Sequence, residues 1–168
     1  MLLFSKISRL PLMCSVIFLI ILSGCGGEPK PDGFPTLYPV SLQFMQEGKP
    51  CAEASVGLVP QDGSKWATGG STDSNGIVTF KTHGKFPGVP EGKYKIVISK
   101  HEREESGPAP QSMYEAQKTL EVYDLIDPDY SIPEKTSLEI EIRPGKNSFD
   151  PFDLGKEIRQ RVKKPGER

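Results

Sequence analysis

The sequence predicts an all-β protein, built as an antiparallel β-sandwich. Several short segments alternate apolar and polar residues, which is the pattern of strands with one buried face. These segments follow one another at intervals of roughly 8–12 residues, with turn residues between them. Strands do not alternate with helical segments, so no parallel sheet is expected. The 168 residues suffice for one domain, and 17 Gly and 16 Pro disfavour a helical bundle.

The first expected strand begins at Val40, where Val40, Leu42 and Phe44 alternate with less apolar neighbours. Residues 47–50, which read Glu-Gly-Lys-Pro, form a turn after it. A second strand follows and ends at Pro60, since proline cannot donate to a sheet ladder. Its apolar positions are Ala52, Ala54, Val56 and Leu58.

Residues 66–72 are mostly small and form a short third segment. A hairpin signal follows at residues 73–76, which read Asp-Ser-Asn-Gly. Asp73 can cap this turn, and Gly76 suits a left-handed backbone conformation. The next strand carries Ile77, Val78 and Phe80. Residues 83–92 hold two Pro and three Gly and are expected to be a loop.

Two more strands and a short edge segment complete the expected fold. The strands span residues 93–100 and 137–143, and the edge segment carries Phe149, Phe152 and Leu154. The segment that connects the two strands, residues 101–135, is open to two interpretations. Residues 119–123 fit a strand, whereas a helix would carry on one face Met113, Ala116, Gln117, Leu120 and Tyr123. The basic tail, residues 156–168, is expected to be frayed helix or coil.

Residues 1–24 have the pattern of a secretory signal peptide. Lys6 and Arg9 give a basic start, and residues 12–22 are apolar apart from Ser15. This run is shorter than the about 20 residues that a membrane-spanning helix needs. Its end, Leu-Ser-Gly-Cys at residues 22–25, resembles the lipobox of bacterial lipoproteins. In that family the signal is cleaved between Gly24 and Cys25, and the Cys25 thiol carries a diacylglycerol.

The lipobox resemblance implies a lipoprotein of the cell envelope, anchored to a membrane through acyl chains such as palmitate. The residue after Cys25 is Gly26 rather than Asp, which implies the outer membrane where the host has two. Residues 25–39, rich in Pro and Gly, are then a lipidated tether that leads to a domain at residues 40–155. After cleavage only Cys51 remains as a free thiol, so no intramolecular disulfide can form.

Three motifs in the body follow one another in order. They are Gly-Lys-Pro with Ala-Ser-Val at residues 48–56, Thr-Asp-Ser-Asn-Gly at 72–76, and Pro-Glu-Gly-Lys-Tyr-Lys-Ile at 90–96. Together they resemble the carboxypeptidase regulatory-like, or transthyretin-like, domain. The stretch from Pro128 to Leu154 is similar to small bacterial envelope lipoproteins that carry this domain. The resemblance implies a Greek-key, prealbumin-like sandwich of about seven strands, without peptidase activity.

No residue pattern predicts a catalytic, metal or cofactor site, and we expect that the protein is not an enzyme. His83 and His101 lack the spacing of zinc ligands and are expected in solvated loops. Cys51 is expected to be a buried structural residue, and no G-x-S-x-G or nucleotide-binding glycine motif is present. Asp73 and Asp127 are expected to cap turns rather than to bind calcium. The net charge of −1 gives no reason to expect a nucleic-acid partner.

Trp66 is the candidate glycan contact, because it follows a polar loop in which a sugar could stack on its ring. Packing at the core or at an edge is the favoured alternative for this side chain. Two functions therefore remain. The first is a non-catalytic, lipid-anchored envelope protein with a structural or protein-interaction role. The alternative is a carbohydrate- or peptide-binding module at the cell surface that uses Trp66 and residues 101–135. The partners expected are the membrane, through the lipid, and an envelope protein or glycan.

Overall fold

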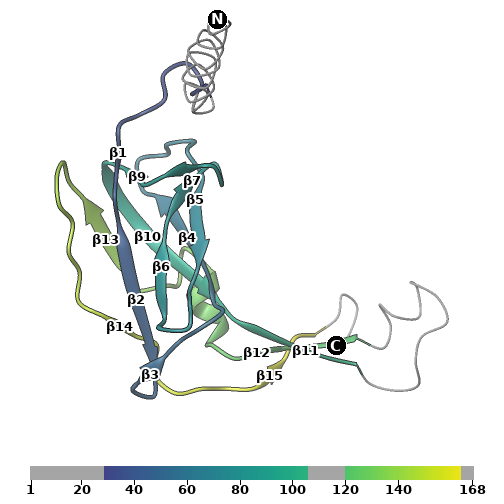
Figure 1. Ribbon diagram of the computed structural model, residues 1–168. Coiled ribbons are helices and arrows are strands. Elements are labelled where there is room, and N and C mark those ends of the chain that lie inside the picture. Colours follow the sequence, from purple (N-terminus) through teal and green to yellow (C-terminus); the bar gives the residue numbers. More distant parts are fainter. Residues whose placement is uncertain (1–28, 106–119, 164–168) are drawn as a thin grey trace, which may run out of the picture. The chain divides into compact units, whose positions relative to one another are not determined.

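The computed structural model describes residues 29–105 and 120–163 (Figure 1). The chain divides into two compact units, residues 1–34 and 35–168, and the fold below is that of the second unit. Its described residues form strands joined by turns, with one short 3-10 helix and no α-helix. The prediction of an all-β protein is therefore confirmed.

The larger sheet has six antiparallel strands in the order β13-β10-β4-β5-β7-β8. Their bounds are Glu139–Ile142, Gly92–Ser99, Ser55–Pro60, Thr68–Ser71, Lys81–Thr82 and Phe86–Pro87. Along β10 the side chains of Tyr94, Ile96 and Ile98 are buried and alternate with more exposed ones. The strands predicted at residues 93–100 and 137–143 are thus confirmed, because their apolar alternation matches a half-buried sheet.

The second layer is organised around β2. The strands are β2 at Ser41–Gln46, β3 at Lys49–Pro50, β6 at Ile77–Thr79 and β14 at Phe152–Asp153. β3 and β6 pair with β2 in the antiparallel sense. β14 is parallel to β2, with Phe152 opposite Phe44, which differs from the purely antiparallel sandwich that the sequence predicts. The reason is the connection: the chain leaves β13 in one sheet and crosses to the other before β14 (Figure 1).

Side chains from both sheets join in one hydrophobic core, so the architecture is sandwich-like. Phe44 is fully buried in this core and stacks on Phe152, with ring centroids 5.6 Å apart. Burying a side chain of this size contributes roughly 1.5–3 kcal/mol to folding. The core side chains contributed by the main strands are Leu42, Phe44, Val56, Leu58, Val78, Tyr94, Ile96, Ile98, Ile140 and Ile142.

The turn at residues 73–76 has the predicted construction. Asp73 Oδ1 accepts hydrogen bonds from the backbone N–H groups of Asn75 at 2.8 Å and Ile77 at 2.9 Å. Gly76 has φ = 71°, the left-handed conformation that favours glycine. A Cβ atom at Gly76 would lie 2.4 Å from the carbonyl oxygen of Phe44, so the turn also needs glycine for space.

The loop expected at residues 83–92 instead contains two short strands, β8 and β9, the second at Val89–Pro90. β8 pairs with β7, and β9 pairs with β1 at Leu37–Tyr38. Both short strands end in proline, which keeps its carbonyl acceptor and is tolerated at sheet edges. The expectation of a loop was wrong here because two-residue pairing depends on a distant partner strand rather than on local composition.

The described residues of the segment 101–135 form two strands and the 3-10 helix. β11 spans His101–Glu105, β12 spans Leu120–Asp124, and the helix spans Pro128–Ser131 with Asp127 as its N-cap. The interpretation of residues 119–123 as a strand is therefore confirmed by β12. Of the residues that a helix would have carried on one face, Met113, Ala116 and Gln117 lie outside the described residues. Within the described part of the tail, where frayed helix or coil was expected, Gln160–Arg161 instead forms β15 against β12.

Candidate functional site

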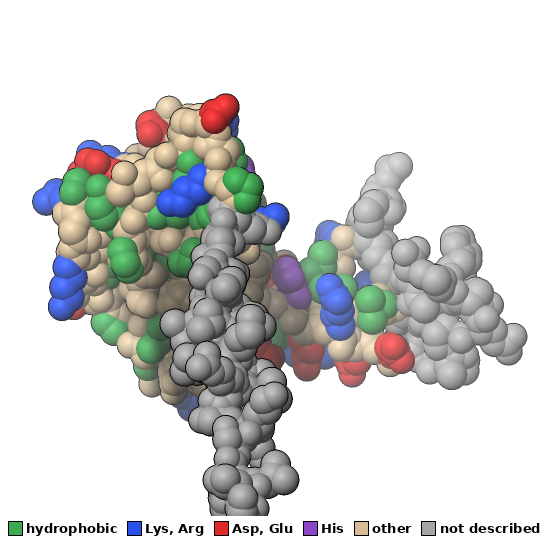
Figure 2. All heavy atoms as spheres, turned by 45° about the horizontal axis from the view of Figure 1, so that its top comes forward, with side chains coloured by type: hydrophobic (Ala, Val, Ile, Leu, Met, Phe, Trp, Pro, Cys, Tyr) green, Lys and Arg blue, Asp and Glu red, His purple; other side chains and the backbone are tan. Residues whose placement is uncertain are grey.

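Three strands, β11, β12 and β15, form a separate antiparallel sheet outside the core. Every residue of β11 and β15 is exposed, and every residue of β12 is intermediate in burial. The sequence of β11, His-Glu-Arg-Glu-Glu, offers no apolar face that could be buried. Figure 2 shows acidic, basic and hydrophobic side chains close together over this part of the molecule.

The register of the sheet gathers charged residues on one face. Glu102 lies opposite Tyr123 and Glu104 opposite Glu121, while Tyr123 lies opposite Arg161 on its other side. Residues directly opposite one another share a face of a sheet. This face therefore combines acidic groups of β11 and β12 with a basic group of β15.

Arg159 connects the strands across this face. Its guanidinium lies 3.7 Å from the centroid of the Tyr123 ring, and it donates to Glu102 at 2.8 Å and to Glu104 at 2.6 Å. The hydrogen bonds to these two carboxylates raise the pKa of Arg159 further above its ordinary value. Stacking on a ring together with a planar fork of donors is chemistry that arginine offers and lysine does not.

Tyr123 and Glu121 extend this network. The Tyr123 hydroxyl donates to Glu121 Oε2 at 2.6 Å, and the same carboxylate group lies 3.4 Å from Arg161 Nε. The hydrogen bond to Glu121 raises the pKa of Tyr123. We call Glu102, Glu104, Glu121 and Tyr123 together the arginine-binding face.

The opposite face of the sheet is of mixed character. His101 Nδ1 lies 2.8 Å from Asp124 Oδ1, so this predicted loop histidine lies at a strand end beside a carboxylate. Val162 is 38% exposed, and its backbone N–H donates to the carbonyl of Val122 at 2.8 Å. Apolar side chains are thus present on an exposed sheet, which is the composition of many contact surfaces.

The sheet is connected to the body just after β12. Gln46 Nε2, from the end of β2, donates to the carbonyl of Leu125 at 2.8 Å. Leu125 N–H in turn donates to the carbonyl of Lys100 at 2.9 Å, and the side chain of Ile126 is buried in the core. The exposed sheet therefore starts from a fixed position at one end of the sandwich.

Trp66, the candidate glycan contact, lies just before β5 and is intermediate in burial. Its ring centroid lies 5.1 Å from that of His83, and Lys65 Nζ lies 5.3 Å from the Trp66 centroid. His83 and Lys65 are therefore close neighbours of the Trp66 ring. His83 itself lies in an exposed turn with φ = 53°.

The remaining polar candidates are structural. Cys51 is a buried free thiol whose pKa is raised chiefly by burial, the expected environment of an unreactive cysteine. Asp127 accepts a hydrogen bond from the backbone of Asp129 at 3.0 Å and so caps the 3-10 helix. Among the described residues, no three His, Cys, Asp or Glu side chains lie together in a way that could hold a metal ion.

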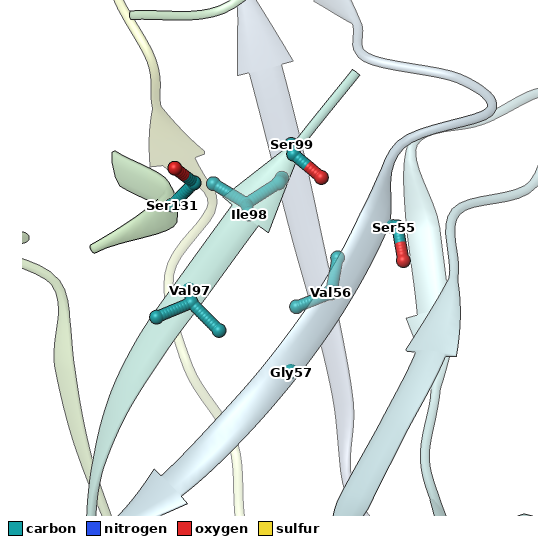
Figure 3. Close-up of a pocket in the computed structure, with 7 residues that line it drawn as sticks. All are labelled: Ser55, Val56, Gly57, Val97, Ile98, Ser99 and Ser131. Carbon is teal, nitrogen blue, oxygen red and sulfur yellow. The ribbon is translucent and has the colours of Figure 1, made fainter. Parts of the chain in front are cut away.

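Several open hollows lie on the described part of the body. One, of about 220 Å³, is lined by residues of β4 and β10, among them Gly57 and Val97, and by Ser131 of the 3-10 helix (Figure 3). Another, of about 420 Å³, is mostly apolar and is lined by residues such as Val40, Phe80 and Pro87. Neither of these two brings together the titratable groups that general acid–base chemistry needs. A third hollow, of about 230 Å³, lies over β10 and β13 and is lined by the exposed charged residues Lys93, Glu139 and Glu141.

The arginine-binding face was not predicted from the sequence. A signal was present in the spacing: Glu102 and Glu104, and likewise Arg159 and Arg161, are two residues apart and would share a face if their segments were strands. Gly24 and Cys25, the predicted cleavage and lipidation positions, lie outside the described residues. Within the described part of the chain, no helix has the length and apolar character needed to cross a membrane.

Comparison of the chain with protein-family models, with curated proteins and with solved structures finds no match in any of the three.

Proposed function

We propose that the protein is a non-catalytic lipoprotein of the bacterial cell envelope, whose β-sandwich presents the β11–β12–β15 sheet to a protein partner. The observation that carries this proposal is the sheet itself: it lies outside the core, yet its strands are ordered by ion pairs on Arg159 and Arg161. An ordered, charged sheet with exposed valine at its margin suits recognition of a protein surface.

The anchor is proposed from the N-terminal sequence. Leu-Ser-Gly-Cys at residues 22–25 ends an apolar run, and a Pro- and Gly-rich segment follows. Lipid on Cys25 would hold the domain at a membrane, and more than one acyl chain makes such anchoring durable. The finer part of the fold, a Greek-key, prealbumin-like connection of the two sheets, belongs to the same proposal.

Lipidation is tested in a bacterial host that expresses the full chain and is fed an alkyne fatty acid. The wild-type chain takes up the label and sediments with membranes, whereas Cys25→Ser does neither. Cys51→Ser is the matched control, since Cys51 is a buried thiol of the body, and it retains the label. Equal labelling of the wild type and Cys25→Ser would refute the anchor.

The contact surface is tested with a photo-crosslinking amino acid placed at Arg103, which is exposed on β11. In cells, we expect an adduct of defined size with one envelope protein. The control position is Glu91, exposed in the turn between β9 and β10. The same adducts from both positions, or none from Arg103, would contradict the proposal.

A further inference from the structure

The C-terminal strand β15 covers the edge of β12. We propose that this edge is a strand-binding site that the chain's own β15 occupies, and that an extended, arginine-bearing strand of a partner protein replaces it. The inference rests on the proposed function, the contact of this sheet with a protein, and names the chemistry of the partner. Adding a strand to a sheet edge is a common mode of peptide recognition.

β15 is a short occupant of this edge. It pairs with β12 at two positions only, Tyr123 with Arg161 and Asp124 with Gln160, whereas β11 pairs with β12 at five. Beyond the strand, Val162 N–H donates to the carbonyl of Val122 at 2.8 Å. A two-residue exposed strand has little local stability, so it opens far more readily than the core.

The chain leaves the core immediately before this segment. Leu154 is buried, and its N–H donates to the carbonyl of Met45 at 2.8 Å. Gly155 follows with φ = 76°, and no atom lies within 4 Å of the position that a Cβ would take. From residue 156 to 163 every residue except Ile158 is exposed. Two long hydrogen bonds also hold this segment, from Ile158 N–H to the carbonyl of Leu125 at 3.4 Å and from Gln46 Nε2 to the carbonyl of Lys156 at 3.5 Å. The segment can therefore separate from β12 without opening the hydrophobic core.

The arginine-binding face specifies what can replace β15. Arg159 and Arg161, two residues apart, both reach this face, where one stacks on Tyr123 and both contact glutamates. An incoming strand that carries arginine at positions i and i+2 would make the same contacts. The planar guanidinium is needed for stacking and for paired hydrogen bonds, so lysine at these positions should bind much less tightly.

The experiment uses the full chain and a fluorescent peptide with the sequence of residues 156–163, Lys-Glu-Ile-Arg-Gln-Arg-Val-Lys. The double variant Arg159→Ala/Arg161→Ala weakens the internal strand and frees the edge. The apparent affinity for the peptide is the intrinsic affinity multiplied by the fraction of molecules in which β15 has left the edge. Because the double variant raises this fraction, it should bind the peptide at least about tenfold more tightly than the wild type. Arg143→Ala, which removes an exposed arginine paired with Glu141 on β13, is the matched control and binds the peptide as the wild type does.

Two further measurements test specificity. A peptide with lysine in place of both arginines should bind the double variant at least about tenfold more weakly. Adding Glu102→Gln and Glu104→Gln to the double variant should abolish binding of the arginine peptide, with folding checked by circular dichroism. Equal affinity of the peptide for the wild type and the double variant, or equal binding of the two peptides, would overturn the inference.

The remaining outcomes are also decisive. If the wild-type chain forms dimers in solution that Arg159→Ala/Arg161→Ala dissociates, the occupant is the β15 of a second copy, and the assignment to a different protein is wrong. If crosslinking from Arg103 yields a partner but the peptide binds no variant, the strand-replacement inference fails while the proposed function stands. If crosslinking also yields no partner, the proposed function itself fails.

Discussion

Tyr94 illustrates how much one residue of the sequence could predict. The sequence predicts a strand at residues 93–100, and the structure places Tyr94 of this strand at 2% exposure, with its hydroxyl donating to the carbonyl of Pro90 at 3.0 Å. Burial, and to a lesser extent the charge of Asp62, raise its pKa to about 12. The hydrogen-bond partner could not be predicted, because it depends on how the chain bends before β10.

Tyr94 should make stability depend on pH in the alkaline range. Between pH about 10, where an unfolded tyrosine ionises, and pH about 12, where folded Tyr94 does, the unfolded state binds fewer protons. The contribution of Tyr94 to the free energy of unfolding is therefore complete below pH about 10 and is lost as the pH rises towards 12. Urea unfolding from pH 8 to 11 should show a steeper fall for the wild type than for Tyr94→Phe. Parallel pH profiles for the two proteins would contradict this explanation.

Substitutions at Gly63 and Gly76 distinguish the cost of backbone strain from the cost of a steric clash. Gly76 and Gly63 both have positive φ, but only at Gly76 would a Cβ meet backbone, 2.4 Å from the Phe44 carbonyl oxygen. Gly63→Ala should cost about 1–2 kcal/mol of unfolding free energy from the left-handed conformation alone. Gly76→Ala should cost clearly more, because the turn must also shift. Equal losses in urea denaturation would show that the clash is relieved without penalty.

At the scale of elements, the sequence predicted the strands that have an apolar face. β2, β4, β10 and β13 all lie where alternating Leu, Val, Ile and Phe residues indicated strands. β11 and β15 were not predicted, because Glu102, Glu104 and Arg161 give no apolar period. Their conformation depends on pairing with β12, a contact between segments far apart in the sequence. The arginine-binding face was missed for the same reason.

The ion pairs of Arg159 should stabilise β15 locally rather than the whole fold. Arg159 is exposed and contacts Glu102 and Glu104 of β11 and Tyr123 of β12, which lie outside the hydrophobic core. Its removal therefore leaves the core contacts intact. For Arg159→Ala we expect an unchanged urea midpoint but at least about tenfold faster hydrogen exchange at the Val162 amide. Lys163→Ala, which changes a neighbouring exposed cation, should leave that exchange rate unaltered. A shifted urea midpoint with unchanged exchange would contradict the assignment.

At the scale of the whole molecule, strand periodicity predicted the all-β, two-layer character of the protein. It did not predict how the chain connects the two layers. Local sequence cannot show that β14 runs parallel to β2, because the direction is set by the crossing from β13. β14 is held on the second layer by its pairing with β2, by the stacking of Phe152 on Phe44 and by the buried side chain of Leu154.

Phe44 and Phe152 should therefore differ in their effect on stability. Phe44 is fully buried, so Phe44→Ala should lower the free energy of unfolding by about 3–5 kcal/mol. Phe152 lies at the edge of the core and is partly exposed, so Phe152→Ala should lower the free energy of unfolding distinctly less than Phe44→Ala. Equal losses in denaturant titrations would mean that β14 belongs to the core rather than to its margin.

We propose that a lipid on Cys25 holds the protein at the membrane on which the partner of the exposed β11–β12–β15 sheet lies. The most direct test is photo-crosslinking from Arg103 in intact cells, in the wild-type chain and in Cys25→Ser. We predict a single defined adduct in the wild type that is lost in Cys25→Ser although the chain is still exported and folded. An adduct that forms equally without Cys25, or that forms as readily from Glu91, would contradict the claim.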